Sequence, residues 1–328
     1  MSKKLGYAIA LGLLLAAPLY IYPIFLMKLL CFALFACAFN LLIGFTGLLS
    51  FGHAAFFGGA AYVAGHAMSQ WGLPVELSIL AGTLSGALLG LVVGILAIRR
   101  QGIYFTMITL AMAQMLYFLC LQAPFTGGED GLQGVPRGKL LGILDLQNDI
   151  SMYYVVVLIF ILGFAVIMRT VNSPAGQVLK ALKDNEPRAL SLGYDVDRYK
   201  LLAFVLSAGI SGLAGSTKTI VLGFATLSDV HWSMSGLVVL MVLVGGLGTI
   251  LGPIVGAVVI VALENRLGDI GNWLAQVTRI EWFYAIGESV TIVTGFIFIV
   301  CVLLFRRGIV GEIGAWNARR VARANATP

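Results

Sequence analysis

Long apolar runs separated by short polar segments set the pattern of this chain. A helix of about 20 apolar residues is long enough to cross a bilayer. The pattern predicts ten membrane-spanning helices, at residues 5–27, 29–45, 53–70, 76–98, 103–122, 152–169, 201–222, 235–249, 252–264 and 283–305. We therefore expect an all-α polytopic membrane protein, with one transmembrane domain covering residues 1–328.

Two of these predicted spans allow an alternative. The runs at 235–249 and 252–264 are short for full crossings, and glycines and Pro253 separate them. A re-entrant or broken-helix hairpin would also fit, because irregular backbone is tolerated at membrane depth when protein buries it. The first run raises a different question, since Lys3 and Lys4 precede it as in a signal peptide. Its apolar character continues to Phe25 without a polar segment, so we interpret it as an uncleaved first span.

One polar stretch, residues 172–200, interrupts the apolar pattern near the middle of the chain. Six of the 21 Lys and Arg residues fall between Arg169 and Lys200. The stretch predicts two short helices: Ser173 is a suitable N-cap with Pro174 after it, and Pro187 restarts the chain. Gly193 suits the end of the second helix. We call residues 172–200 the elbow. Its amphipathic pattern favours a connector on the membrane surface, and a docking element for a soluble partner is the alternative.

The positive charges sort the loops into two groups. With ten spans, the basic clusters all fall on one side together with both termini, which the positive-inside rule makes the cytoplasmic side. These clusters are Lys3–Lys4, Arg99–Arg100, the elbow, Arg306–Arg307, and Arg319, Arg320 and Arg323. The loop at 123–151 has four acidic and two basic residues and falls outside. Such clustering at loop ends favours membrane topology over nucleic-acid binding as the reason for the net charge of +6.

Glycines recur at every fourth position at two places in the chain. Small residues at this spacing let helices approach closely, so both stripes predict tight helix packing. The stripes are Gly82, Gly86, Gly90 and Gly94, and then Gly248, Gly252 and Gly256.

The stretch from Asn40 to Tyr62 is rich in glycine where a helix is expected. It predicts a broken helix whose free backbone groups face a solute pathway. Close packing around a glycine-rich connector is the alternative. The pathway candidates are Asn40, Gly44, Gly47, Ser50, Gly52 and His53.

Isolated polar residues in apolar spans are costly and are candidate site residues by default. They include His53, His66, Lys218, Glu264 and Glu288, although Lys218 lies near a span end, where it would reach the interface. The four cysteines all lie in apolar runs and are expected to be packing residues. The chain has no P-loop, zinc-protease or nucleophile-elbow motif, so we expect no catalytic residue, no bound metal and no cofactor on this chain.

Three motifs resemble a known family. The elbow residues Gly176, Ala181, Asp184–Glu186, Ala189 and Gly193 resemble the cytoplasmic coupling motif of ABC-importer permeases. The residues that continue the elbow motif, 199–204, resemble the branched-chain amino acid permease family, specifically its M-type subunit. The stretch 40–62 and the Gly-Gly-x-Asp-Gly run before Pro136 also resemble this family. Pro187 and Arg188 depart from the family pattern, which usually has small or aliphatic residues there.

The resemblance implies a permease in a bacterial inner membrane, importing branched-chain amino acids or similar small polar solutes. It implies a second related permease subunit, two ATPase subunits that hold ATP and Mg, and a periplasmic binding protein. The outer loop at 123–151 is either part of the landing site for that binding protein or an ordered surface loop. The residues expected to contact the ATPase groove are Lys180, Asp184, Asn185, Glu186, Arg188, Ala189 and Gly193. Urea, amides or aromatic acids are alternative solutes. An ion-coupled secondary transporter is the alternative class, but neither paired inverted repeats nor a midplane carboxylate site is evident.

Overall fold

The computed structural model describes residues 12–142, 144–278, 295–296, 299, 303, 308–312 and 316, with the backbone alone for 267–278. The chain divides into two compact units, Met1–Gly236 and Leu237–Pro328. The predicted span at 283–305, with Glu288 and Cys301, lies almost entirely outside the described residues, as do the basic residues at both chain ends.

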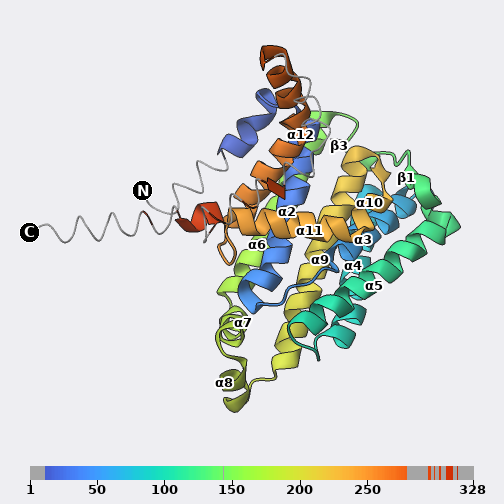
Figure 1. The fold of residues 1–328 in the computed structure, drawn as a ribbon. Coiled ribbons are helices and arrows are strands. Elements are labelled where there is room, and N and C mark those ends of the chain that lie inside the picture. The colour runs from blue at the N-terminus through green and yellow to red at the C-terminus, as the bar shows by residue number, and fades with distance from the viewer. Residues whose placement is uncertain are drawn as a thin grey trace, which may run out of the picture. The chain divides into compact units, whose positions relative to one another are not determined.

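The first unit is a helix bundle with short irregular segments at one end (Figure 1). Its long helices are α2 (Pro23–Thr46), α3 (His53–Ser69), α4 (Val75–Ala97), α5 (Ile103–Gln122), α6 (Asp149–Asn172) and α9 (Val196–Leu222). Its short elements are η1 (Ala17–Leu19), η2 (Pro124–Thr126), η3 (Gly128–Asp130), β1 (Leu132–Gln133), β2 (Lys139–Leu140), β3 (Leu144–Asp145), α7 (Pro174–Asp184), α8 (Glu186–Ser191), β4 (Phe224–Ala225) and α10 (Leu227–Val230).

Burial separates central helices from peripheral ones. The most apolar windows of α2 and α9 are 78% and 67% buried, whereas that of α5 is 22% buried. The exposed side chains of α4, α5 and α6 are mainly Leu, Ile, Val, Met and aromatic residues. Such faces are stable against lipid. Among the described residues, α2, α4, α5, α6 and α9 are long and apolar enough to cross a membrane.

The predicted boundary between the first two spans is wrong. The helix at 12–16 ends at η1, and α2 begins at Pro23 and runs without a break through residue 28, where the boundary was expected. Pro18 and Pro23 explain the shift, because proline lacks the N–H needed within a helix but fits its first turn. Position 28 is a lysine, and a single charged residue does not end a helix.

The first glycine stripe lies where α4 meets α9. A Cβ built on Gly86 would lie 3.0 Å from the Cα of Gly212 and 3.1 Å from the carbonyl oxygen of Ala208. Gly90 faces the side chain of Ala208 still more closely, and Gly82 faces Ser216. Only glycine leaves room for this approach of the two backbones.

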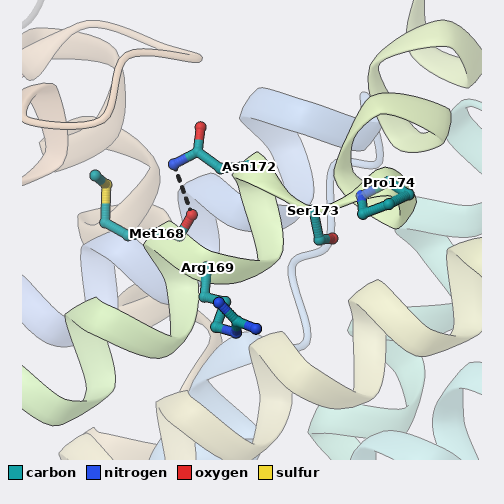
Figure 2. Close-up of a pocket in the computed structure, with 5 residues that line it drawn as sticks. All are labelled: Met168, Arg169, Asn172, Ser173 and Pro174. Atoms are coloured by element: carbon teal, nitrogen blue, oxygen red, sulfur yellow. Dashed lines mark hydrogen bonds between the residues drawn. The ribbon is translucent and has the colours of Figure 1, made fainter.

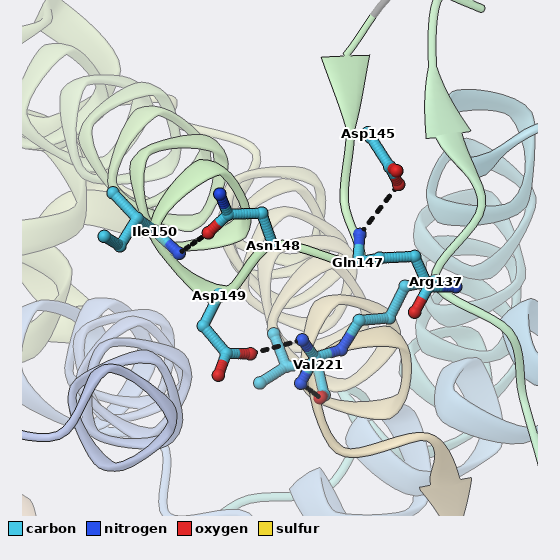
Figure 3. A network of polar contacts seen from close by, with 7 residues as sticks. All are labelled: Arg137, Asp145, Gln147, Asn148, Asp149, Ile150 and Val221. Carbon is cyan, nitrogen blue, oxygen red and sulfur yellow. Dashed lines mark hydrogen bonds and ion pairs between the residues drawn. The ribbon is translucent and has the colours of Figure 1, made fainter.

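The loop at 123–151 forms an ordered cap on one end of the first unit. β1 pairs antiparallel with β4, and β2 with β3. Arg137 donates a hydrogen bond of 2.5 Å to Asp149 at the start of α6, and another of 2.9 Å to the carbonyl oxygen of Val221 at the end of α9 (Figure 3). A cation is favourable at the C-terminal end of a helix. The cap therefore ties two spans together.

In the second unit, glycines bring two helices into direct backbone contact. α11 (Trp232–Gly245) runs across the boundary between the units, and α12 (Gly252–Thr278) follows a short connection. Positions Gly245 and Gly256 have no room for a Cβ, because each faces backbone of the opposite helix. The helix that contains the predicted span 252–264 continues to Thr278 through Glu264 and later polar residues. Side-chain polarity does not stop a helix that lacks proline.

Candidate functional site

The elbow is a folded element with its own small core. Leu179 and Leu182 of α7 pack with Ala189 of α8 and with Val196 and Ala203 of α9, and all five side chains are buried. α7 begins as its sequence predicts: Ser173 is the N-cap, and its hydroxyl accepts a hydrogen bond of 3.2 Å from the N–H of Gly176.

The second elbow helix has a defined beginning and end. Asn185 is its N-cap, since its side chain accepts a hydrogen bond of 3.1 Å from the N–H of Arg188. Gly193 has the left-handed φ of +86°. The N–H groups of Gly193 and Tyr194 bond back to the carbonyls of Leu190 and Ala189, at 2.9 and 3.2 Å, which is the Schellman arrangement. Caps at both ends make α8 rigid despite its length of one and a half turns.

Two of the residues expected to contact an ATPase, Ala189 and Glu186, make contacts within this chain. Ala189 is 3% exposed within the core of the elbow, so a glutamate placed there would disrupt the elbow itself. Glu186 accepts hydrogen bonds from Lys200 at 2.7 Å and from Gln101 at 2.8 Å. It therefore ties α8 to α9 and to the loop between α4 and α5. In the sequence, a small residue that packs inside the elbow and a carboxylate that pairs within the chain look the same as residues that bind a partner.

The outer surface of the elbow carries apolar residues that our sequence reasoning missed. Leu190 is 56% exposed, Leu192 70% and Tyr194 41%. Asp184, Asn185, Arg188 and Gly193 are exposed beside them. We call Leu190, Leu192 and Tyr194 the elbow tip. The signal was present, because these are the apolar positions left over once Leu179, Leu182 and Ala189 are assigned to the core.

The break between α2 and α3 lies inside the bundle. α2 ends at Thr46 and Gly47 takes the left-handed φ of +76°. α3 begins at His53, whose Nε2 lies 2.9 Å from the hydroxyl of Ser207, about three turns into α9. With 17 residues, α3 is shorter than the about 20 that a full crossing needs. The predicted helix break is present. The segment between α2 and α3 lies at the end of the bundle that faces the elbow.

The expected pathway residues at this break are mostly enclosed. Asn40, Ser50 and His53 are each 3% exposed or less. Gly44 and Gly52 are also buried, and Gly47 is the exposed member of the set. In this conformation the polar side chains stabilise the packing of the chain and do not line an open surface. The alternative of close packing around a glycine-rich connector describes them better.

His53 makes a defined polar contact in an aromatic surrounding. The Ser207 hydroxyl donates to the carbonyl oxygen of Ala38 at 2.6 Å, so its oxygen accepts from the His53 Nε2–H. The rings of Phe39, Phe56 and Phe204 surround the imidazole, with centroids 5.0, 5.4 and 5.8 Å away. The Nδ1 atom has no hydrogen-bond partner among the described residues. These contacts join α2, α3 and α9 at one point.

Lys218 forms a buried ion pair and does not reach the interface as its position in the span suggested. Its Nζ donates to Asp229 of α10, and the two side chains are 6% and 2% exposed. Asp229 also accepts from the backbone N–H of Thr226 at 3.2 Å and from its hydroxyl at 3.1 Å. The rings of Phe57 and Phe224 lie 5.9 and 5.8 Å from the ammonium group. Sequence reasoning missed Asp229, because it lies in the segment between two predicted spans.

Where α6 passes into the elbow there is a surface pocket (Figure 2). It is lined by Met168, Arg169, Asn172, Ser173 and Pro174. The Asn172 side-chain amide donates a hydrogen bond of 2.8 Å to the carbonyl oxygen of Met168, in the last turn of α6. In the described part of the chain, no three His, Cys, Asp or Glu side chains gather as a metal site would require.

Comparison with known proteins decides the family. Residues 22–306 match the family described as "Branched-chain amino acid transport system / permease component", across both units. The chain belongs to this family. The resemblance inferred from the three sequence motifs is therefore confirmed, and together with the apolar helices it makes the chain a multi-pass membrane protein.

Several curated proteins are similar to the chain. The high-affinity branched-chain amino acid transport system permease protein LivM of Escherichia coli is 26% identical, and that of Salmonella typhimurium 28%; each alignment covers 71% of this chain and 60% of the relative. The ribose import permease protein RbsC of Haemophilus influenzae is 25% identical over 63% of this chain and 66% of its own length. The chain thus spans about three fifths of the LivM relatives it matches. No solved structure matches it.

Proposed function

We propose that this chain is the membrane-spanning permease subunit of an ATP-driven importer. It would form the translocation pathway with a second, related permease subunit, and two ATPase subunits would bind ATP and Mg and supply the energy. A periplasmic binding protein would deliver the solute. The permease family and the LivM relatives support this proposal. Branched-chain amino acids are the first solute class to test. The RbsC relative makes ribose-like sugars the second.

The observation that carries the proposal is the construction of the elbow. An element that receives force from an ATPase must be rigid and anchored, because a flexible loop would absorb the motion. The elbow has its own core, caps on both helices, and the Glu186–Lys200 pair, in which the lysine side chain is 4% exposed. Its tip then presents Leu190, Leu192 and Tyr194 outward. Exposed apolar residues on a rigid support are typical of a docking site for another protein.

The arrangement of the ends supports the proposed topology. α7 and α8 project from one end of the first unit, and β1, β3 and α10 lie at the other (Figure 1). The hydrogen bond from Gln101 to Glu186 brings the loop next to Arg99 and Arg100 to the elbow end. Grouping of basic residues at one end favours that end as cytoplasmic. Ten spans within a single permease domain, with both termini cytoplasmic in a bacterial inner membrane, complete the proposal.

The test uses the complete transporter, with candidate partner subunits produced beside this chain. Leu192→Glu places a charge in an apolar contact and should abolish co-purification of the ATPase, since a buried unpaired charge is strongly unfavourable. Leu144→Glu, at a position 44% exposed on β3 in the cap at the other end of the first unit, is the matched control away from the elbow tip. ATP-dependent uptake of leucine and of ribose into proteoliposomes then identifies the solute class. Normal assembly and normal uptake for Leu192→Glu would refute docking at the tip.

A further inference from the structure

The elbow supplies a cap for a helix that is distant in sequence. The Lys183 ammonium donates a 2.8 Å hydrogen bond to the carbonyl oxygen of Gly44, in the last turn of α2, across 139 residues of chain. The last four carbonyls of a helix lack partners within it, and the C-terminal end of the helix dipole attracts a cation. Lys183 therefore satisfies both needs of the α2 terminus.

The same side chain also contacts the beginning of the break. A Cβ built on Gly47 would lie 3.4 Å from the Lys183 Cγ, so the lysine stem passes over this glycine. One turn earlier on α7, the Lys180 ammonium lies 5.7 Å from the centre of the Phe45 ring. Both lysines face the end of α2, but Lys183 bridges α2 and the break.

The break is firmly attached beyond this point. The Thr106 hydroxyl of α5 donates 2.9 Å to the carbonyl oxygen of Leu49. Gly52 approaches α5 so closely that a Cβ would lie 2.7 Å from the carbonyl oxygen of Thr109. His53 then contacts Ser207 of α9. Because the segment is short and held on both sides, a displacement of the α2 terminus must move the start of α3.

We propose that Lys183 is the positioning residue that transmits movement of the elbow to the break between α2 and α3. The contact runs from α7 through Gly44 and Gly47 to His53, where α2, α3 and α9 meet. This inference rests on the proposed function, in which an ATPase moves the elbow. Lys183 acts through the helix that it caps and touches neither solute nor nucleotide.

The test compares two replacements of Lys183 in the complete reconstituted transporter. Lys183→Met keeps the aliphatic stem and removes the charge, whereas Lys183→Arg keeps a donor for the Gly44 carbonyl. Lys28→Met removes a charge from the first half of α2, away from its C-terminal end, without removing that hydrogen bond. The readouts are solute imported per ATP hydrolysed, and amide hydrogen exchange of residues 42–55 in the complete transporter without nucleotide.

We expect Lys183→Met to assemble with the ATPase and to import about two- to fivefold less solute per ATP, the range set by a charge at a helix terminus. Exchange within 42–55 should rise by a similar factor. Lys183→Arg and Lys28→Met should behave as the unchanged protein does. If Lys183→Met is poorly folded, Lys183→Gln is measured in its place.

Two results would overturn the inference. An unchanged ratio of solute to ATP, with unchanged exchange at 42–55, removes any transmitting role for Lys183. Loss of ATPase binding with unchanged exchange makes Lys183 a docking residue instead. The proposed function fails only if the unchanged transporter binds no ATPase, or hydrolyses ATP without importing any solute. Failure of the Lys183 inference is seen in the variants alone, so the two failures are distinguishable.

Discussion

The buried Lys218–Asp229 pair gives a prediction whose size follows from the structure. In Lys218→Met, the Asp229 side chain stays 2% exposed and keeps only the N–H and hydroxyl of Thr226 as donors. Removing one partner of a buried pair costs about 3–5 kcal/mol, because the remaining charge is uncompensated. Folded proteins are stable by only about 5–15 kcal/mol, so the variant should be markedly destabilised.

The double variant Lys218→Met/Asp229→Asn separates charge from packing. It removes both charges, and the Asn side chain can still accept from the Thr226 N–H, so we expect it to recover most of the loss. The control is Arg137→Met, whose pair with Asp149 is 17% and 37% exposed. A more solvated pair contributes less, about 0–1 kcal/mol. Arg137 also donates to the Val221 carbonyl. The stability lost in Arg137→Met should therefore lie between zero and the stability lost in Lys218→Met.

Equilibrium unfolding in mixed micelles with increasing SDS, followed by circular dichroism, measures these differences. The expected order of stability places the unchanged protein first, then the Arg137 variant and the double variant, and Lys218→Met last. If Lys218→Met unfolds at the same SDS fraction as the unchanged protein, the pair does not stabilise the fold. If the double variant is as unstable as the single one, the loss comes from packing and not from an unpaired charge.

Three further predictions follow from the packing and the topology. Gly86→Leu and Gly90→Leu should reduce the yield of monodisperse protein in size-exclusion chromatography, because each new side chain would clash with the backbone or side chains of α9. The control Ala165→Leu, at an exposed position of α6, should leave that yield unchanged. Gly193→Val should lower uptake without abolishing it, because a left-handed φ of +86° costs a residue with a side chain about 1–2 kcal/mol. Unchanged uptake by this variant would show that the cap is dispensable. Single cysteines at positions 3, 99, 319 and in the elbow should resist impermeant labelling in intact cells, and those at 123–151 should react; a labelled elbow would reverse the proposed topology.

Most of the local structure could be predicted from the sequence. Apolar runs predicted the helices, since backbone polar groups in lipid must bond within their own segment. The elbow caps at Ser173 and Gly193 were predictable because caps depend on neighbouring residues alone. The α2–α3 break was also predicted, because the glycine-rich run has little tendency to continue a helix. The three motifs correctly indicated the family.

The tertiary structure decided what those elements contact. Ala189 and Glu186 appeared to be docking residues, but they face the core of the elbow and α9, because the rotation of a short helix depends on its packing partners. Lys218 pairs with Asp229 across a turn, and Lys183 bonds Gly44 across 139 residues of chain. Pairings between distant segments leave no periodic pattern in the sequence, since a charge or carbonyl acquires its partner only when the helices pack.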